Sequence, residues 1–160
     1  MAVGTIEPRK NIRLLIDIWE KFEDPPKLII AGRRGWNSDE LLERLDELSF
    51  NTKWLDYRDD IKDDELDILF QNAQAVLLPS VVEGFGLPGL EAQAHGVPLI
   101  CSDISVFKEL FKGYADFANP YSQSEWKAQI EKRMKQPIAR NIPIQTRTWQ
   151  DFAKAILSYE

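Results

Sequence analysis

Short apolar segments alternate along this chain with longer segments in which apolar residues recur every three or four positions. The short segments predict strands over 2–5, 27–31, 53–55, 75–78, 99–101 and 115–118. The longer segments predict helices over 11–22, 39–48, 63–72, 90–95, 106–111, 124–134 and 145–158. Regular alternation of strand and helix is typical of βα units and a parallel sheet. We therefore expect an α/β fold, a three-layer doubly wound parallel sheet of about six strands.

The first three predicted helices each carry an apolar stripe, which indicates the face that packs on the sheet. The stripes consist of Leu15, Ile18, Trp19 and Phe22, then Leu41, Leu42, Leu45 and Leu48, then Leu66, Leu69 and Phe70. We expect these side chains to point inward. They predict a core on which the rest of the domain is built.

From length we expect a single domain over 1–160, and composition argues against two classes. No apolar run approaches the roughly 20 residues of a membrane span, and the first residues carry no visible secretory signal. A formal charge of −6 argues against a nucleic-acid partner, because affinity for a polyanion comes from clustered Lys and Arg. The single cysteine, Cys101, excludes an internal disulfide, and we expect a buried, inert thiol.

The segment from Glu83 to Glu91 carries the main chemical signal. Two carboxylates flank a turn containing Gly84 and Gly86, and Pro88 marks the first turn of a helix. The free N–H groups of that turn, together with the helix dipole, favour phosphate or a polarised oxygen. The turn follows a predicted buried strand, and ligands of open α/β sheets bind at the carboxyl ends of strands.

Two basic pairs also follow predicted strands. Arg9-Lys10 follows the first strand and Arg33-Arg34 follows the second, which are positions where a diphosphate can be held without a globally basic surface. Gly32 stands beside the second pair, and a glycine there fits either close approach of a ligand or a plain tight turn.

These residues resemble the signature of a known enzyme family. The matching segments are 3–11, Leu78-Pro79-Ser80, Glu83 to Pro88, Leu90-Glu91-Ala92, 95–100 and Ser102-Asp103. They resemble the family-4 retaining glycosyltransferases, enzymes of GT-B architecture with two facing Rossmann-like domains. The similarity is to the carboxyl-terminal, donor-binding domain and covers nearly the whole chain.

The resemblance implies roles for the acidic segment. Glu91 is implied to hold the ribose hydroxyls of the nucleotide, and Glu83 to approach the donor sugar near the reacting centre. The backbone N–H groups of Phe85, Gly86 and Leu87 are implied to contact sugar hydroxyls and phosphate. From the residues alone, the favoured interpretations are that Glu91 complements the helix dipole and that Glu83 is a solvated loop residue.

Lys10 is similar to the family's diphosphate-binding lysine, whose charge stabilises the departing nucleoside diphosphate. The family often has an arginine where this chain has Thr5, so the second phosphate cation is open, and Arg9 is the candidate substitute. Tyr57 matches the region where relatives contact the nucleobase. The resemblance implies no metal and no cofactor beyond the nucleotide sugar, which is a co-substrate.

The implied function is transfer of a hexosyl group from a nucleoside-diphosphate sugar to an acceptor hydroxyl with retention. The segment Glu7 to Asn11 is similar to mannosyltransferases, so GDP-mannose is the first expected donor and a UDP-hexose the second. We expect the amino-terminal acceptor domain to be absent, the isolated chain to be weakly active or inactive, and the acceptor glycan or lipid-linked glycan to bind the missing half. The implied location is cytoplasmic, with the missing half reaching the inner face of the membrane.

Two other functions are open to the same sequence. One is a non-catalytic nucleotide-sugar-binding or interaction module, which differs from the enzyme only in turnover. The other, a dehydrogenase or flavodoxin-like domain, is disfavoured because no GxGxxG follows the first strand.

Three further features have structural interpretations. The acids between Asp59 and Asp67 suit a helix start better than a cation site. His95 suits a helix end better than catalysis, and one His with one Cys cannot build a zinc site. In relatives the last helix crosses to the other domain, so we expect an exposed apolar face of Trp149, Phe152 and Ile156.

Overall fold

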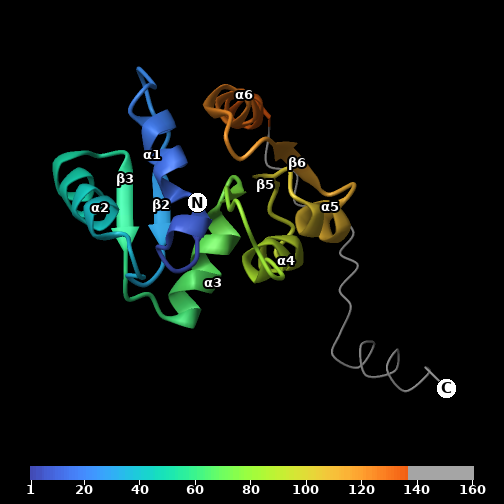
Figure 1. The fold of residues 1–160 in the computed structure, drawn as a ribbon, viewed down its shortest axis with the longest axis horizontal. Coiled ribbons are helices and arrows are strands. Elements are labelled where there is room, and N and C mark those ends of the chain that lie inside the picture. Colours follow the sequence, from blue (N-terminus) through green and yellow to red (C-terminus); the bar gives the residue numbers. More distant parts are fainter. Residues whose placement is uncertain (137–160) are drawn as a thin grey trace.

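The computed structural model describes residues 1–136, which form strands and helices in strict alternation (Figure 1). The strands are β1 (Ala2–Val3), β2 (Leu28–Ala31), β3 (Leu55–Arg58), β4 (Val76–Leu78), β5 (Leu99–Ser102) and β6 (Ala115–Ala118). The helices are the 3-10 turn η1 (Pro8–Lys10), α1 (Ile12–Trp19), α2 (Asp39–Asn51), α3 (Asp63–Asn72), α4 (Leu87–Ala94), α5 (Ser105–Phe111) and α6 (Gln123–Met134). The predicted α/β fold is confirmed.

All strand pairs within the two sheets are parallel, in the orders β1-β2-β3 and β4-β5-β6. The sheets meet along β1 and β4, where the N–H of Leu77 donates to the carbonyl of Met1 at 2.8 Å. The Met1 amino group donates in turn to the carbonyl of Ala75 at 2.8 Å. The strands therefore follow one another in space as β3-β2-β1-β4-β5-β6. This is the doubly wound order, and its direction reverses between β1 and β4.

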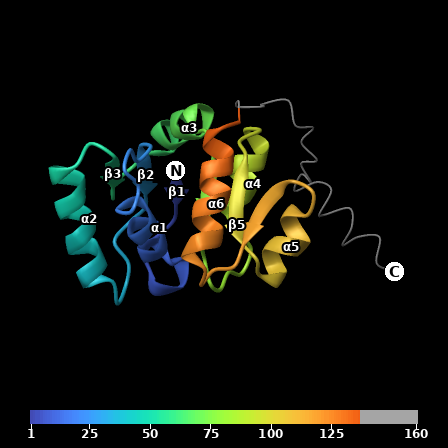
Figure 2. The ribbon, with the colours of Figure 1, turned by 90° about the horizontal axis from the view of Figure 1, so that it is seen from above.

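Two hydrophobic cores lie on opposite faces of these strands. Successive side chains of β4 and β5 point to opposite faces of the sheet. Leu77 and Ile100 therefore belong to one core, and Val76 and Leu99 belong to the other. The first core is closed by α1, α2 and α6, and the second by α3, α4 and α5. Figure 2 shows α1 and α3 on opposite sides of the strands. The predicted three-layer arrangement follows from this division.

The predicted stripes within 11–22 and 39–48 are buried except at their last residues, whereas the stripe within 63–72 is buried only at Phe70. Leu15, Ile18, Trp19, Leu41, Leu42, Leu45 and Phe70 are buried, whereas Phe22, Leu48, Leu66 and Leu69 are partly buried. Phe22 lies beyond the end of α1, and Leu48 lies in the last turn of α2.

Several predicted boundaries are wrong. The third strand was expected over 53–55, but β3 runs over Leu55–Arg58. It is an edge strand that pairs with β2 alone, so its polar residues are held by backbone bonds and carry no apolar signal. The strand expected over 2–5 is confined to Ala2–Val3, because Gly4, with φ of 135°, leaves extended geometry.

Two predicted helices also begin elsewhere. The helix expected over 11–22 is α1 over Ile12–Trp19, and Asn11, whose φ of 55° is left-handed, separates it from the preceding turn η1. The helix expected over 90–95 starts at Leu87, one residue before Pro88, which agrees with the proline as a start signal.

Cys101 is fully buried in β5, as expected of an inert thiol. Burial, with the charges of Asp103 and Asp116, raises the pKa of the thiol to about 12, so it stays protonated at neutral pH. Within 1–136 no helix has the length and apolar character needed to cross a membrane. The helix predicted over 145–158, with Trp149, Phe152 and Ile156, lies outside the described residues.

Candidate functional site

The candidate site lies where the loops after β1 and β4 meet, at the carboxyl ends of the two middle strands. The N–H of Val81 donates to the carbonyl of Arg9 at 2.9 Å, which fixes one loop against the other. The crevice beside adjacent strands at such a reversal point is where doubly wound sheets bind ligands. The fold therefore brings the predicted basic pair and the acidic segment to the same place.

Lys10, Arg9 and Glu83 form a compact charged cluster in this crevice. Lys10 Nζ lies 2.6 Å from Glu83 Oε2, and Arg9 donates to Glu83 Oε1 at 3.0 Å. Arg9 also donates through Nε to Glu7 Oε2 at 2.8 Å. The buried hydroxyl of Ser80 donates to Glu83 Oε2 at 3.3 Å. Both oxygens of Glu83 thus face cations of the neighbouring loop.

The cluster is shielded from solvent. The side chains of Glu83 and Lys10 are only 10% and 13% exposed, while that of Arg9 is 40% exposed. Burial raises the pKa of the Glu83 carboxyl, but the hydrogen bond from Lys10, the Lys10 and Arg9 charges and the Gly84 N–H together hold that pKa below its usual value. Glu83 is therefore ionised at neutral pH.

A glycine makes room for the lysine. A Cβ placed on Gly4 would lie 3.4 Å from Lys10 Cε and 3.5 Å from Lys10 Nζ, so the lysine side chain extends across the bare Cα. The φ of Gly4, 135°, is one that other residues rarely adopt. This role of Gly4 was not predicted, although a glycine after the first strand was the available signal.

Asn11 was also missed. Its Nδ2 donates to the carbonyl of Pro79 at 3.2 Å and to that of Pro120 at 2.9 Å, so one side chain ties together the chain segments after β1, β4 and β6. Asparagine tolerates the left-handed φ of 55° better than most residues. Its place directly after Lys10 was the only signal in the sequence.

We expect Asn11→Ala to lower the free energy of unfolding by about 2 kcal/mol more than Asn37→Ala, because two hydrogen bonds to buried carbonyls are lost. Asn37 is a matched control, since it is exposed and has a similar φ of 49°. Both substitutions place alanine at a left-handed φ, so the backbone cost should be the same in the two variants. Urea unfolding followed by circular dichroism measures the difference, and equal losses in the two variants would exclude the bridging role of Asn11.

The acidic segment turns into α4 at Gly86, whose φ of 76° is left-handed. A Cβ there would lie 2.6 Å from a ring carbon of Phe107, so only glycine fits. Gly84 has open space instead, since a Cβ there would have no atom within 4 Å, and its φ is not left-handed. Phe85 and Leu87 are exposed, whereas Gly86 between them is buried.

Glu91 lies on the exposed surface of α4 and takes no part in the Lys10 cluster. Partial burial of its carboxylate raises the pKa of Glu91. The charge of Asp63 also raises this pKa, while the charge of His95 lowers it. The structure thus joins Glu83 to Lys10 and Arg9, and leaves Glu91 with other charged neighbours.

Gly32 has a structural reason to be glycine. A Cβ there would lie 1.9 Å from the carbonyl oxygen of Gly4, so the main chains after β1 and β2 touch directly. The N–H of Gly32 donates to the carbonyl of Arg58 at 2.9 Å, and its own carbonyl accepts from Tyr57 Oη at 3.4 Å. Close approach of two backbones, rather than a plain turn, accounts for the residue.

In the second basic pair, Arg33-Arg34, the guanidinium of Arg34 is bonded to two aspartates outside the acidic segment. Arg34 donates to both oxygens of Asp46, at 2.8 and 2.9 Å, and to Asp59 at 3.0 Å. The hydrogen bonds to Asp46 and Asp59 raise its pKa. Its guanidinium also lies over the Tyr57 ring. Of the two predicted basic pairs, therefore, only Arg9-Lys10 faces the acidic segment.

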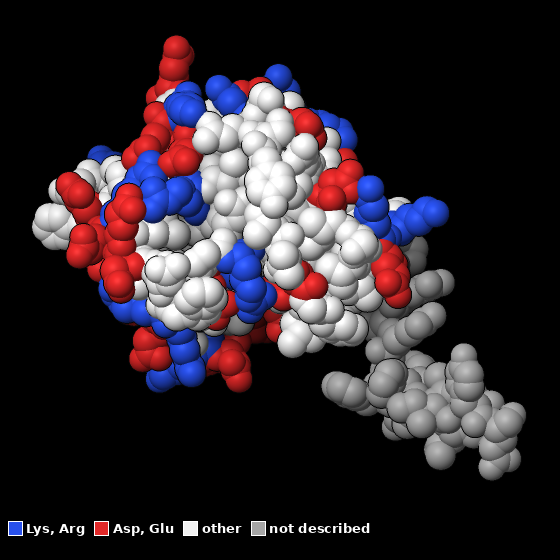
Figure 3. All heavy atoms as spheres, in the orientation of Figure 1, with Lys and Arg blue, Asp and Glu red and all other residues white. Residues whose placement is uncertain are grey.

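Asp63, Asp64 and Glu65 lie in the first turn of α3, as expected of acids at a helix start. Glu65 accepts from the N–H of Lys62 at 3.2 Å at the start of α3, and no three metal-ligating side chains of residues 1–136 come together. His95 ends α4, stacks on Phe70 and pairs with Asp67 at 3.2 Å. On the face shown in Figure 3, basic and acidic side chains are interspersed, without a broad basic area among the described residues.

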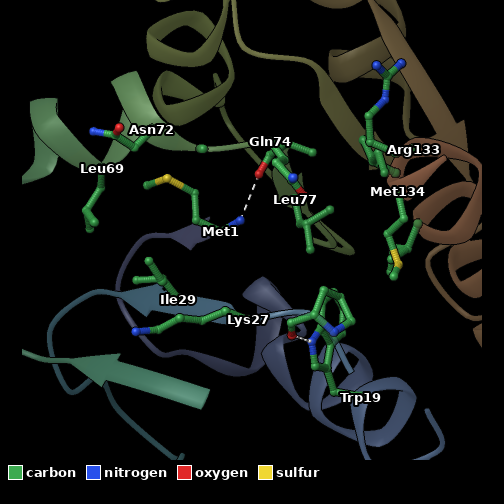
Figure 4. A pocket seen from close by; sticks show the side chains of 15 residues that line it. Met1, Trp19, Lys27, Ile29, Leu69, Asn72, Gln74, Leu77, Arg133 and Met134 are labelled. Carbon is green, nitrogen blue, oxygen red and sulfur yellow. Dashed lines mark hydrogen bonds between the residues drawn. The ribbon is translucent and has the colours of Figure 1, made fainter. Parts of the chain in front are cut away.

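A separate hollow lies elsewhere in the molecule. It has a volume of about 450 Å³ and is lined mainly by apolar side chains, among them Met1, Trp19, Ile29, Leu77 and Met134 (Figure 4). Met1 stands at the amino end of β1, so this hollow lies at the edge of the sheet opposite the Glu83 cluster. Lys27 and Arg133 are the charged side chains of its lining.

The family model and the curated relatives that match this chain are all glycosyltransferases. The family model described as glycosyl transferases group 1 matches residues 1–156. O-antigen chain mannosyltransferase B of Escherichia coli is 34% identical over 146 residues, which cover 89% of this chain and 38% of that protein. O-antigen chain mannosyltransferase RfbU of Salmonella typhimurium is 34% identical over 139 residues, covering 87% and 39%. The chain thus spans less than two fifths of the length of these relatives.

Solved structures share the fold. The apo form of the lipopolysaccharide outer core galactosyltransferase WaaB matches with a TM-score of 0.76 and 20% identity, over 99% of this chain and 48% of that one. Anabaena HepE in complex with UDP matches with a TM-score of 0.70 and 18% identity, over 84% and 39%.

Proposed function

Because this chain belongs to the glycosyl transferases group 1 family, we propose that it is the donor-binding domain of a family-4 retaining hexosyltransferase of GT-B architecture. The observation that carries the proposal is the cluster of Lys10, Arg9 and Glu83 at the reversal point between β1 and β4. Two cations and an acceptor carboxylate converge there, at the sheet edge where a nucleotide sugar would lie.

Each side chain of the cluster has a part in the proposed reaction. Lys10 and Arg9 bind the diphosphate, and their charge stabilises the leaving nucleoside diphosphate as the glycosidic bond breaks. Arg9 serves as the second phosphate cation in place of the arginine that Thr5 replaces. Glu83 accepts hydrogen bonds from the sugar. In this proposal the protein accelerates the reaction by stabilising the charge that develops on the diphosphate and on an oxocarbenium-like sugar. It uses no metal and no strong protein nucleophile.

The nucleoside end of the donor extends along α4 in this proposal. Glu91 accepts hydrogen bonds from the ribose hydroxyls, and the N–H groups of Phe85, Gly86 and Leu87 meet sugar or phosphate oxygens. The exposure of Phe85 and Leu87, on either side of the buried, left-handed Gly86, supports approach of a ligand to the start of α4. Tyr57 and Gly32 lie beside the base, although their contacts with Arg34 and with the Gly4 backbone already account for both residues.

The names of the relatives favour a mannosyl donor and an acceptor in polysaccharide synthesis. We propose GDP-mannose as the first candidate donor and a UDP-hexose as the second. An acceptor-binding domain outside this chain would receive the glycan or lipid-linked glycan, in the cytoplasm and close to the inner face of the membrane.

Titration calorimetry of the full chain with GDP, UDP and ADP tests the proposal. We expect binding of at least one nucleoside diphosphate and a loss of about tenfold in Glu91→Ala, because charge-assisted hydrogen bonds to the ribose disappear. Glu109→Ala, an exposed glutamate on α5, is the matched control and should leave the affinity unchanged.

Absence of heat with all three nucleotides at millimolar concentration, in a chain that circular dichroism shows to be folded, would refute donor binding. Equal affinity of Glu91→Ala and the parent chain would refute the ribose role alone. Turnover of a nucleotide sugar, measured with an acceptor-binding partner domain, separates the enzyme from a module that only binds.

A further inference from the structure

The carboxylate of Glu83 occupies a site built for an anion. Four donors surround it. Its Oε2 lies 2.6 Å from Lys10 Nζ and accepts from Ser80 Oγ, and its Oε1 accepts from Arg9 at 3.0 Å and from the N–H of Gly84. The Glu83 side chain is 10% exposed. Charge and hydrogen bonding of the carboxylate are therefore already satisfied without a ligand.

A diphosphate bound by the same two cations would bring a second anion next to this carboxylate. Lys10 and Arg9 bond Glu83 from one neighbouring loop, so phosphate oxygens within hydrogen-bond distance of both would lie a few ångströms from Glu83. Like charges at such a distance repel strongly when water is partly excluded. One of the two anions has to move.

The chain on either side of Glu83 has open space outside it. No atom lies within 4 Å of the Cβ position at Gly84, and Val82 and Phe85 are 65% and 54% exposed. The anchor of the loop lies earlier, at Ser80, which is buried, and at Val81, whose N–H is bonded to Arg9. Glu83 can thus leave the cations while the loop base stays in place.

We propose that Glu83 is an internal competitor of the diphosphate, an inference that rests on the proposed function. In the free protein Glu83 neutralises Lys10 and Arg9. Binding of the diphosphate displaces the carboxylate, and only then do its oxygens become available to the hydroxyls of the donor sugar. The site therefore presents its sugar-binding carboxylate only after the phosphates are seated.

Glu83→Gln tests this competition because it removes the charge and keeps the shape. We expect the variant to bind inorganic pyrophosphate, GDP and UDP about tenfold more tightly than the parent chain, since a competitor worth about 1.4 kcal/mol is lost. For GDP-mannose and UDP-glucose the gain should be smaller, because the sugar loses its acceptor. Calorimetry at constant ionic strength measures both series.

Glu109→Gln is the matched control, since it removes the same charge from an exposed position on α5 and leaves the Lys10–Glu83 pair intact. Its affinities should change less than twofold. If Glu83→Gln does not fold, Glu83→Asp, one methylene shorter, takes its place and should also tighten pyrophosphate binding.

The outcomes separate the two proposals. Binding by the parent chain with equal or weaker binding by the folded Glu83 variant overturns the competition and leaves the proposed function intact. Failure of both chains to bind any nucleoside diphosphate overturns the proposed function as well. Tighter binding by the variant supports both.

Discussion

Lys10→Met is expected to weaken binding of GDP or UDP about fiftyfold, because a hydrogen bond to a charged group contributes about 1.5–3 kcal/mol. The lysine is 13% exposed and lies across Gly4, so its ammonium is held in one place rather than swinging in solvent. Loss of this cation also leaves Glu83, with Arg9 as its only remaining cation, to repel the incoming phosphates. Titration calorimetry gives the dissociation constants.

Lys53→Met is the matched control, since this exposed lysine lies just before β3 and away from the cluster. It should bind nucleotides as the parent chain does. Lys10→Arg should recover part of the affinity, because it restores the charge with a different geometry. A Lys10→Met variant that is folded and binds within threefold of the parent chain would remove Lys10 from the phosphate site.

Gly32→Ala is expected to lower the free energy of unfolding by about 3 kcal/mol, the upper part of the range for inserting a methyl group into filled space. The new Cβ would lie 1.9 Å from the oxygen and 2.6 Å from the carbonyl carbon of Gly4. Both are backbone atoms, so relief requires β1 and β2 to separate at their carboxyl ends. Urea unfolding followed by tryptophan fluorescence measures the loss.

Gly84→Ala provides the contrast. No atom lies within 4 Å of its Cβ position, and its φ is not left-handed, so stability should change by less than about 0.5 kcal/mol. The pair therefore compares the same chemical change in filled and open space. Equal stability of the two variants would show that the main chains after β1 and β2 do not touch in solution.

The sequence pattern predicted the fold because burial follows periodicity in this chain. The inward stripes of α1 and α2 and the apolar strands β4 and β5 repeat with the periods that helices and buried strands impose. The pattern failed at β3, where Asp56, Tyr57 and Arg58 are held by backbone pairing on an edge strand. Edge strands need less apolar surface, so composition does not mark them.

The site was predicted residue by residue but not as an assembly. Glu83 and Lys10 were each expected to bind a ligand, yet they are 73 positions apart, and nothing local in either segment says that they contact each other. Asn11 escaped notice because its role depends on the carbonyls of Pro79 and Pro120, which only the folded chain brings near. Long-range pairing of this kind lies beyond what a motif encodes.

The adjacency of β1 and β4 also has a folding consequence. Residues before about 72 supply one three-stranded half and later residues the other, and the Leu77, Val81 and Asn11 hydrogen bonds cross between the halves. Nucleation within each half involves mostly nearby residues, whereas docking of the halves closes a long loop. A ligand held by Lys10 and Glu91 would bridge this seam, so nucleotide should oppose its opening and protect amides along β1 and β4 from hydrogen exchange.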